Sequence, residues 1–506
     1  MLKLLVAIFA LLLVGFVAPS YAIESRNCVA FRLDDIQDYW LDGVQAKIIN
    51  TFQEKNASLT IGIIANYFGQ DSKIVNLVKQ GADSTPPLEI ANHGWNHEPF
   101  ATFTENGQWW LLRQANQKIQ SVTGITPDVF IAPYNSINND TFKAVTENNL
   151  DMISANETID KPPYPLENTT LYRFPAVSSF GDLNKNNTSW TNYDHVQIHA
   201  NILRGLYQYG YAVVVLHPQD FSMKHKFNYT DTVNSTRIDE LSSVIDELRS
   251  ENIKIVTMSE IPDQQKVYVK HPSWFDVVSR WCFAGNVSST DFGNLVNYLK
   301  NQKLLTVSPY PPHNNISATY FWVGEPASVD NEYINNLNSA WDDQWVQDFG
   351  GVDDPTKRDA FLPSGFQPHE NPFYLALPYD DFQYNGTRNP DANATYWYNE
   401  KSWPLNESMV KNRWVMITHG DRTAYAQWED AGPFQYDDIK YVFGTSTPKN
   451  TVNKSAGIDL SPTVWDYLGL GKRGIDKISW QFVDYSDVPD GPWKNIVTVS
   501  QVNWSH

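Results

Sequence analysis

Cysteine and basic residues are scarce in this sequence. Its 506 residues include 2 cysteines, and 38 Lys and Arg residues stand against 57 Asp and Glu residues, which gives a formal net charge of −19. A protein with this much negative charge repels polyanions over a Debye length. We therefore expect no nucleic-acid partner and no anionic membrane partner.

The two cysteines leave two alternatives. In an oxidising compartment Cys28 and Cys282 could form one disulfide between the first domain and the segment after it. They could equally remain unpaired thiols, because the sequence does not show whether their Cα atoms come within the distance that a disulfide requires.

Long apolar runs are missing after the N-terminus. The chain begins with Lys3, an apolar run over residues 4–18 and the sequence Ser-Tyr-Ala at 20–22. This pattern predicts a secretory signal peptide, residues 1–22, that is cleaved after Ala22. An uncleaved anchor is the lesser alternative, because the run is short for a membrane span. We expect a secreted, extracellular or cell-surface protein with no transmembrane segment after cleavage.

Export agrees with the Asn-x-Ser/Thr sequons, which are acceptors for N-glycosylation. They predict a glycoprotein, although an asparagine-rich chain also contains such sequons by chance. The sequons begin at Asn56, Asn168, Asn228, Asn286, Asn385 and Asn453.

The first half of the chain alternates strand-like and helix-like segments. Residues 59–64, 129–132 and 212–216 are short apolar runs typical of buried strands. Residues 72–79 and 238–249 have the apolar periodicity of helices. Repeated β/α units of this kind predict a parallel sheet.

In the second half of the chain the hydrophobic pattern is first helical and then strand-like. Residues 271–307 have apolar side chains spaced as in two or three small helices, which predicts a helical module that serves as a spacer or docking element. From residue 318 onward helical signals are sparse, and short aromatic and β-branched runs alternate with Gly, Pro and Asn. They predict a compact all-β domain.

Two adjacent carboxylates, Asp34 and Asp35, follow an apolar run, and two histidines, His93 and His97, lie four positions apart in a later segment. One carboxylate and two imidazoles form a three-ligand set for a divalent cation, with positions left for water and substrate. Neighbouring side chains of a strand point in opposite directions, so one aspartate can face the metal while the other acts as a base. The histidine spacing also fits one turn of a helix. Each motif alone occurs in solvated turns and polar loops too.

A second pair with the same spacing, His195 and His199, lies in a probable helix. Asp194 is adjacent, but no acidic residue at a strand end is evident as a third ligand. We favour a structural or surface role for this pair.

Four short motifs follow one another along the first half of the chain. They are Asp34 with Asp35, His93 with His97, Pro133 with Tyr134, and Leu216 with His217. In this order the chain resembles the polysaccharide deacetylase family, the NodB-type group of family-four carbohydrate esterases, over about residues 28–262. The resemblance implies a distorted (β/α) barrel with its site at the strand ends. It also implies a metal-dependent hydrolase of amide (carbon–nitrogen) bonds, a carbohydrate deacetylase.

The resemblance implies a role for each charged residue. Asp35, His93 and His97 bind a divalent metal, expected to be Zn²⁺, and Asp34 is the catalytic base. His217 is the general acid that protonates the leaving amine.

Pro133 and Tyr134 are expected to shape the substrate groove, with the Tyr134 backbone N–H as oxyanion donor. The family pattern usually has an arginine two residues before this proline, which orients the base, and this chain has Ile131 there. Arg32 or Arg173 could replace that arginine from elsewhere in the chain.

Two stretches of the second half, 428–434 and 456–462, resemble the double-psi β-barrel of rare lipoprotein A and expansin-like proteins. The resemblance places Asp430 in a glycan groove, where it could serve as acid or base. The usual histidine of that family has no counterpart, because Tyr374 stands before the matching Leu-Pro. This favours glycan binding over lytic activity.

These expectations define a signal peptide (1–22), a deacetylase-like domain (23–268), a helical module (269–308) and a β-rich, double-psi-barrel-like domain (309–506). The expected function is hydrolysis of N-acetyl groups from an N-acetylated amino-sugar polymer by a secreted, metal-dependent enzyme. One alternative is a non-catalytic extracellular glycan-binding protein with a degenerate esterase domain. A weaker alternative is glycosidic cleavage through Asp430.

Overall fold

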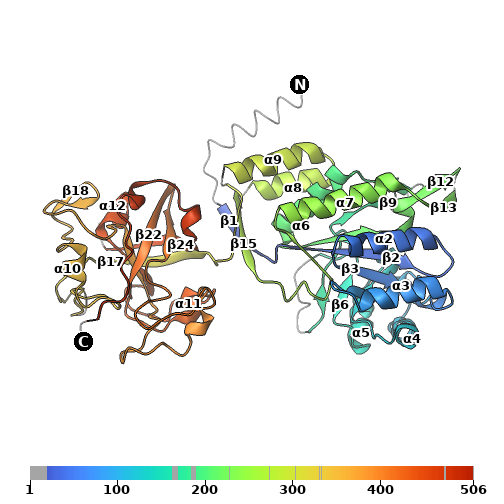
Figure 1. Cartoon of the computed structure of the whole chain (residues 1–506), viewed down its shortest axis with the longest axis horizontal. Helices are drawn as coiled ribbons and strands as arrows, with labels where there is room; N and C mark the ends of the chain where they lie inside the picture. Colours follow the sequence, from blue (N-terminus) through green and yellow to red (C-terminus); the bar gives the residue numbers. More distant parts are fainter. Residues whose placement is uncertain are drawn as a thin grey trace, which may run out of the picture. The chain divides into compact units, whose positions relative to one another are not determined.

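The computed structural model divides into two compact units, residues 18–307 and residues 308–506 (Figure 1). Residues 1–19 of the predicted signal peptide and the sequon at Asn168 lie outside the described residues. Within the described parts, no helix is long and apolar enough to cross a membrane. The structure describes residues 20–161, 169–183, 190–226, 228–272, 274–302, 304–329, 331, 333–471 and 474–504.

The N-terminal unit is built on a parallel sheet that curls into a half-barrel, with the strand order β7-β6-β5-β4-β3-β2-β11-β8 and β14 paired to β2 (Figure 1). This confirms the predicted deacetylase-type α/β fold. The strands are β2 (Cys28–Ile36), β3 (Leu59–Ile63), β4 (Leu88–Asn92), β5 (Val129–Ile131), β6 (Met152–Ser154), β7 (Tyr172–Arg173), β8 (Ser178–Ser179), β11 (Ala212–Leu216) and β14 (Lys254–Val256).

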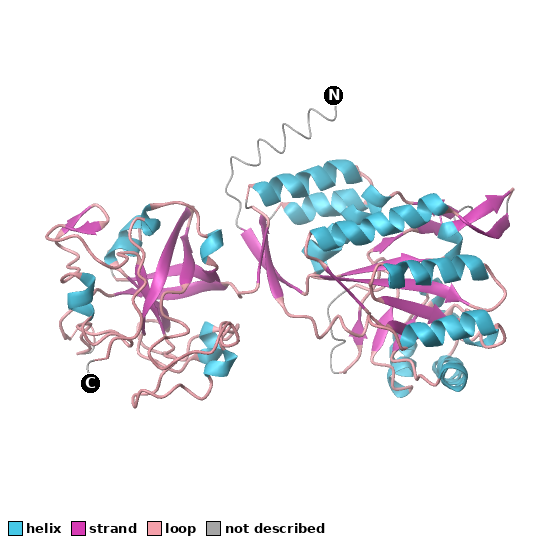
Figure 2. Ribbon diagram, viewed as in Figure 1, coloured by secondary structure: helices cyan, strands magenta, loops and turns pink. Residues whose placement is uncertain are grey.

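Helices connect these strands and pack against the sheet (Figure 2). A sheet covered in this way needs apolar residues on both faces of its strands, and β3 and β11 each bury all five of their residues. The helices are α2 (Asp42–Glu54), α3 (Ser72–Ala82), α4 (Glu105–Thr123), α5 (Asn139–Glu147), α6 (His195–Tyr209) and α7 (Ser235–Ser250).

Short antiparallel strand pairs lie outside the parallel sheet. β1 (Ser20–Ser25) pairs with β15 (Val267–Pro272), so the predicted cleavage point after Ala22 falls inside β1. The other short strands are β9 (Gly181–Leu183), β10 (Trp190–Asn192), β12 (Ser222–His225), β13 (Asn228–Val233) and β16 (Thr306–Ser308).

The predicted helical module forms two helices, α8 (Phe275–Phe283) and α9 (Ser289–Asn301). Their apolar side chains belong to the same hydrophobic core as the parallel sheet. The Phe275 ring, for example, lies 5.9 Å from the Tyr207 ring of α6, edge to face. The boundaries drawn at residues 268 and 308 stay predictions, but these two helices are packed as part of the first unit.

The C-terminal unit is a closed six-stranded β-barrel of mixed direction in the order β17-β23-β20-β22-β21-β24. Buried aromatic rings fill it, such as Trp428 and Phe482, which stack at 5.8 Å. This confirms the predicted all-β domain, while its double-psi identity stays a prediction. The strands are β17 (His313–Tyr320), β20 (Tyr374–Leu377), β21 (Trp414–His419), β22 (Arg422–Ala431), β23 (Ala456–Leu460) and β24 (Ile475–Val483).

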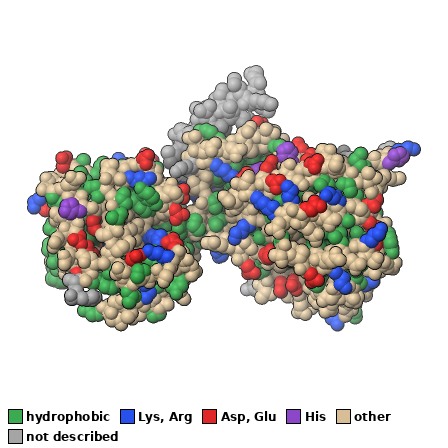
Figure 3. Space-filling view, viewed as in Figure 1, with side chains coloured by type: hydrophobic (Ala, Val, Ile, Leu, Met, Phe, Trp, Pro, Cys, Tyr) green, Lys and Arg blue, Asp and Glu red, His purple; other side chains and the backbone are tan. Residues whose placement is uncertain are grey.

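Smaller elements lie around the barrel. They are α10 (Trp345–Phe349), α11 (Ile439–Val442), α12 (Pro462–Leu468), β18 (Arg358–Asp359) and β19 (Leu362–Pro363). On the face shown in Figure 3, acidic and basic side chains are interspersed over both units.

Candidate active site

The end of β2 directs both aspartates into one cavity. A regular strand would send Asp34 and Asp35 to opposite faces. The pairing of β2 with β3 instead shifts register between Leu33 and Ile36, and Asp35 has a left-handed backbone with φ of 65°. The expectation that the two carboxylates diverge is therefore wrong, because this irregularity turns them toward the same space.

His93 and His97 lie in the loop that follows β4, rather than on a helical turn. Gly94 and His97 have positive φ values of 81° and 63°. The Glu98 carboxylate accepts hydrogen bonds from the backbone N–H groups of Trp95 and Asn96, at 3.1 and 2.8 Å. The helical reading of this spacing is thus wrong, and a carboxylate-stabilised loop brings the two rings together.

The aspartate and the two histidines converge. Asp35 Oδ1 lies 3.3 Å from His93 Nε2 and 3.1 Å from His97 Nε2. In the described residues these three form a group whose ligand atoms all lie within 4.8 Å of one another. His93 is buried, and the other two side chains are partly exposed to the cavity.

The hydrogen bonding of His93 fixes which of its nitrogens faces Asp35. Nδ1 lies 2.8 Å from the Ile131 carbonyl oxygen, which can only accept, so Nδ1 carries the proton and Nε2 presents its lone pair. In this neutral form of His93, two electron-rich atoms, Nε2 and Asp35 Oδ1, face each other in a buried place. Without a cation between them, a protonated His93 donates from Nε2 to Asp35 instead. A divalent cation between them satisfies both, so these residues fit a metal site.

Burial and the charges within this cluster change the pKa values of its three members. Burial raises the pKa of Asp35, but the hydrogen bond from His93 and the nearby imidazoles outweigh burial and hold that pKa well below its usual range. Burial lowers the pKa of His93, and the Asp35 and Asp34 carboxylates outweigh this and raise it overall. Burial, followed by the charge of His93, lowers the pKa of His97 to about 4. His97 is thus an unprotonated ligand at neutral pH.

Asp34 is held by an arginine on its own strand. Arg32 Nη2 lies 3.2 Å from Asp34 Oδ2, and the two side chains are 2% and 4% exposed. Arg32 Nη1 donates to the carbonyl and the hydroxyl of Ser154, at 3.0 and 2.7 Å. Asp34 Oδ1 is buried without a partner in the described residues.

The structure thus decides between the two arginines considered as replacements at Ile131. Arg32 takes the place beside Asp34, whereas Arg173 pairs with Asp160 at 3.0 Å. Of the second histidine pair, His199 has a partner elsewhere, because its Nε2 lies 3.2 Å from Glu251, the residue that follows α7.

His217 follows β11 and faces the same cavity. Its backbone N–H donates to Asp220 Oδ2 at 2.8 Å, and its Nδ1 lies 3.8 Å from that oxygen. The Trp190 ring packs edge to face on the imidazole at 4.9 Å, and Trp190 Nε1 donates to Asp220 Oδ1 at 2.7 Å. Burial raises the pKa of Asp220. Asp220 and Trp190 therefore position His217.

Pro133 and Tyr134 form the lip beside the histidine loop. A Cβ added at Gly94 would lie 3.1 Å from Pro133, so the two segments pack tightly. The Tyr134 ring is 66% exposed and lies 4.4 Å from the His97 ring. Tyr134 has a left-handed backbone with φ of 55°, and within the described residues its N–H has no hydrogen-bond acceptor.

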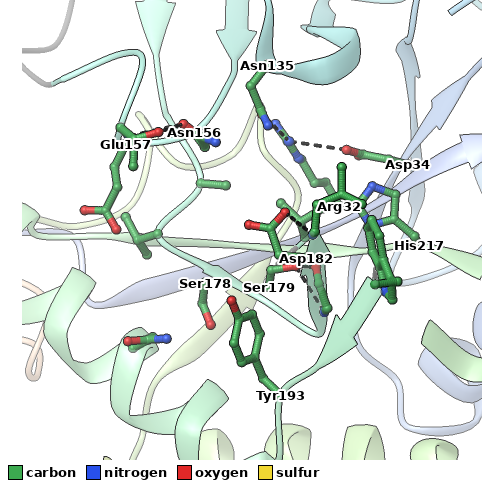
Figure 4. Close-up of a pocket in the computed structure, with 18 of the residues that line it drawn as sticks. Arg32, Asp34, Asn135, Asn156, Glu157, Ser178, Ser179, Asp182, Tyr193 and His217 are labelled. Atoms are coloured by element: carbon green, nitrogen blue, oxygen red, sulfur yellow. Dashed lines mark hydrogen bonds and ion pairs between the residues drawn. The ribbon is translucent and has the colours of Figure 1, made fainter. Parts of the chain in front are cut away.

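One cavity of about 620 Å³ is lined by the predicted site residues except Pro133, and by two of the supporting residues: Asp34, Asp35, His93, His97, Tyr134 and His217, with Arg32 and Trp190. Figure 4 shows Arg32 beside Asp34 with His217 close by, and on the other side of the cavity Asp182, Ser178 and Tyr193. The predicted site residues of the first unit thus come together at the ends of its strands.

Sequence reasoning missed the supporting residues. Ser154, Glu98, Asp220 and Trp190 were not singled out. Only Asp220 carried a signal, since an acidic residue three positions after His217 fits a capping arrangement, and the His217 N–H does donate to the Asp220 carboxylate.

The C-terminal candidate Asp430 lies in the barrel wall. Its Oδ1 accepts hydrogen bonds from the backbone N–H groups of Ala340 and Ala431, each at 2.8 Å. Burial, with the nearby Asp459 charge, raises the pKa of Asp430 to about 7. Tyr374, which stands where the family has histidine, is buried and donates its hydroxyl to Asp353 at 3.0 Å.

The two cysteines, Cys28 and Cys282, are both unpaired and buried. Of the two alternatives left by the sequence, the structure contains free thiols. Burial raises the pKa of Cys28 to about 12.

Fold and site together define a deacetylase-type α/β half-barrel with a candidate metal centre at its strand ends. Residues 23–153 match the family model described as polysaccharide deacetylase. This match covers about a quarter of the 506 residues, and all of it lies in the N-terminal unit, which is similar to that family over this stretch. The comparison with curated proteins gives no match.

Three solved structures illustrate the likeness. A family-four pseudoenzyme from Bacillus anthracis is 13% identical, with 47% of this chain and 66% of that chain covered and a TM-score of 0.33. A family 4 acetyl xylan esterase from Clostridium thermocellum, with cobalt bound, is 19% identical (47% and 91% covered, TM-score 0.32). A family 4 carbohydrate esterase from Streptomyces lividans, with acetate, is 15% identical (45% and 90% covered, TM-score 0.29). At these identities and TM-scores the likeness carries no assignment of function, and the family resemblance depends on the match over residues 23–153.

Proposed function

We propose that this protein is an exported, metal-dependent deacetylase that hydrolyses N-acetyl groups from an amino-sugar polysaccharide. The observation that carries the proposal is the convergence of Asp35, His93 and His97 beside a second, arginine-held carboxylate in one cavity. The N-terminal signal pattern supports export.

The three ligands leave room for a cation with open coordination positions, and nitrogen and carboxylate donors suit Zn²⁺. When bound, the cation polarises the acetamide carbonyl and lowers the pKa of a water molecule. The donor set alone does not separate Zn²⁺ from Co²⁺, so Zn²⁺ is part of the proposal.

The protein groups divide the proton transfers between them. Asp34 Oδ1, which has no partner in the described residues, takes a proton from the attacking water, while Oδ2 stays on Arg32. The Tyr134 N–H donates to the developing oxyanion. His217, held by Asp220 and Trp190, gives its proton to the amide nitrogen as the carbon–nitrogen bond breaks. Acetate and a free amine leave.

Acetate release from an acetylated chitooligosaccharide tests the proposal. The wild type should release acetate, and Asp35→Ala should lose both that activity and bound metal. Asp239→Ala is a matched control, because Asp239 is exposed on α7. Acetate release that survives Asp35→Ala at the wild-type rate would reject the proposal.

A non-catalytic glycan-binding protein is the alternative, and the missing family arginine was its motive. The Arg32–Asp34 pair supports the enzyme over this alternative, because it places a guanidinium of β2 beside Asp34. Tight glycan binding by metal-loaded protein without any acetate release would favour this alternative. For the C-terminal barrel we propose glycan binding near Asp430, and shortened chains in a product analysis would instead indicate cleavage there.

A further inference from the structure

The C-terminal unit has a cavity of its own. Its volume of about 380 Å³ lies within the ~300–1,000 Å³ that is usual for small-molecule sites. It is bounded by the start of β21, the end of β24 and residues 497–501. Asp430 is not among its described lining residues, so this cavity is not the site proposed near Asp430.

Two amide side chains of the cavity wall each have an oxygen without a partner. Asn412 Oδ1 and Gln501 Oε1 are buried, and no donor among the described residues reaches either atom. Asn412 Nδ2 donates to the Ser500 carbonyl at 2.8 Å, which fixes the orientation of this amide. A buried acceptor without a donor is unfavourable. A ligand that fits this cavity therefore supplies N–H or O–H groups.

The cavity also has one carboxylate without a cationic partner. Asp484 Oδ1 accepts a hydrogen bond from a tyrosine hydroxyl at 2.7 Å, and within the described residues Asp484 forms no ion pair. The basic side chains nearby are already paired. Arg413 Nη2 lies 2.7 Å from Glu400, and Lys494 Nζ lies 3.7 Å from Asp490. The charge left over is therefore negative, which favours a cationic ligand.

Aromatic rings form much of the remaining wall. The Trp414 and Tyr485 rings lie 5.8 Å apart, and Tyr485 is 56% exposed. The Arg413 guanidinium lies over the Trp397 ring at 4.3 Å, so a cation already packs on this wall. Ring faces of this kind attract ammonium groups. Trp414 Nε1 makes no hydrogen bond within the described residues, and it suits an oxygen atom of the same ligand.

We propose that this cavity binds a primary ammonium group carried by a sugar, as in a glucosamine unit with a free amine. An ammonium group has three donors and no acceptor, which matches the free oxygens of Asn412, Gln501 and Asp484. The sugar supplies the oxygen for Trp414. N-acetylation removes the charge and leaves a single N–H, so an acetylated unit should bind more weakly.

This site gives the C-terminal unit a place in the reaction sequence. The proposed deacetylation releases free amines along the polymer, and the cavity would keep the protein on chains that it has already modified. Only this link rests on the proposed function, because the site itself follows from the donors, acceptors and charge of the C-terminal unit.

Calorimetry with the full chain at pH ~6, where carboxylates are ionised, compares the tetramer of glucosamine with that of N-acetylglucosamine. Asp484→Asn and Gln501→Met should each weaken binding of the glucosamine tetramer about tenfold or more, as expected when a hydrogen bond to a charged group is lost. Binding of the acetylated tetramer should not change. Asp484 is exposed, so Asp484→Asn should unfold at the wild-type temperature.

Asp421→Asn is the matched control, because Asp421 is exposed in the turn between β21 and β22, at the other end of β21 from Trp414. It should bind both tetramers as the wild type does. Wild-type affinity for the glucosamine tetramer in both Asp484→Asn and Gln501→Met would overturn the inference.

Tetralysine separates two sources of ammonium groups, because it carries them without a sugar. It should bind more weakly than the glucosamine tetramer. Equal affinity that falls by the same factor in Asp484→Asn would show that the cavity takes peptide amines, and would overturn the assignment to a sugar.

Calorimetry needs no turnover, so the two proposals fail separately. A protein that binds the glucosamine tetramer through Asp484 but releases no acetate would refute the deacetylase alone. Acetate release by a protein whose glucosamine binding ignores Asp484→Asn and Gln501→Met would refute this inference alone.

Discussion

Arg32 Nη2 lies 3.2 Å from Asp34 Oδ2, two positions along the same strand. Alternate residues of a strand share a face, so the pair needs no other element to bring it together. Its burial means that neither charge tolerates loss of the other. A guanidinium therefore lies beside Asp34 although position 131 is an isoleucine.

The first prediction concerns this pair. Arg32→Leu should lower kcat about 10²-fold or more, because the base loses the group that orients it. It should also reduce the free energy of unfolding by about 3–5 kcal/mol, as expected when one partner of a buried pair is removed. Arg32→Lys keeps the positive charge but lacks the planar guanidinium that reaches Ser154. Its kcat and its free energy of unfolding should therefore lie between those of the wild type and those of Arg32→Leu. The measurements are acetate-release kinetics and urea unfolding.

A control separates orientation from stability alone. Arg173→Leu breaks the partly buried pair with Asp160, which lies outside the cavity lining. It should destabilise the protein while the folded fraction keeps its kcat. Equal loss of kcat in both leucine variants would contradict the role given to Arg32.

The second prediction concerns metal binding. Added Zn²⁺ should raise the thermal unfolding temperature of chelator-treated protein, because a ligand that binds only the folded state stabilises it by about 2.7 kcal/mol at a hundredfold excess over Kd. His93→Ala with His97→Ala should abolish this rise and the bound metal. The matched double variant His195→Ala with His199→Ala should keep both, since His199 contacts Glu251. The measurement is the metal content of each purified variant. Stoichiometric metal in His93→Ala with His97→Ala would show that these histidines are not the metal ligands.

The third prediction concerns Asp220. Asp220→Asn keeps the shape but removes the charge beside His217, so kcat should fall about 10–100-fold while KM changes little. Trp190→Phe removes only the N–H donor to Asp220 and keeps an aromatic ring beside the imidazole, so its effect should be smaller. Steady-state kinetics on one chitooligosaccharide compare the two. A larger effect of Trp190→Phe would mean that the ring system, not the carboxylate, positions His217.

The sequence was sufficient for the parts of the site that depend on residue type and order. The alternation of strand-like and helix-like segments predicted the parallel sheet, and Asp35, His93 and His97 meet at its edge as expected. Buried parallel strands can be recognised in a sequence because each is a short apolar run. Parallel strands also bring their carboxyl ends to one edge of the sheet, where the site residues meet.

Backbone detail could not be predicted. The register shift after Leu33 and the left-handed backbone of Asp35 decide that both aspartates share a cavity, and no residue there is a glycine that would announce such a conformation. The histidine loop likewise depends on Glu98, whose role appears only when the chain turns back on itself. Cys28 and Cys282 stayed ambiguous for the same reason, because pairing depends on distances in the fold.

The last prediction concerns Asp430 and pH. Its pKa is about 7 in the folded protein, raised mainly by burial, against ~3.9 for an unfolded chain. The folded state therefore holds this proton more tightly, and the stability that the protonated carboxyl contributes is complete below pH ~3.9 and is lost as pH rises through about 7. Asp430→Asn imitates the protonated form, and its amide oxygen can still accept from Ala340 and Ala431. The free energy of unfolding of the variant should match that of the wild type near pH 4 and exceed it near pH 8 by on the order of 3 kcal/mol.

Urea unfolding followed by tryptophan fluorescence at several pH values measures this free energy. Asp490→Asn, on a fully exposed side chain, should change neither value, and an unaltered pH slope in Asp430→Asn would show that Asp430 is ionised in the folded barrel.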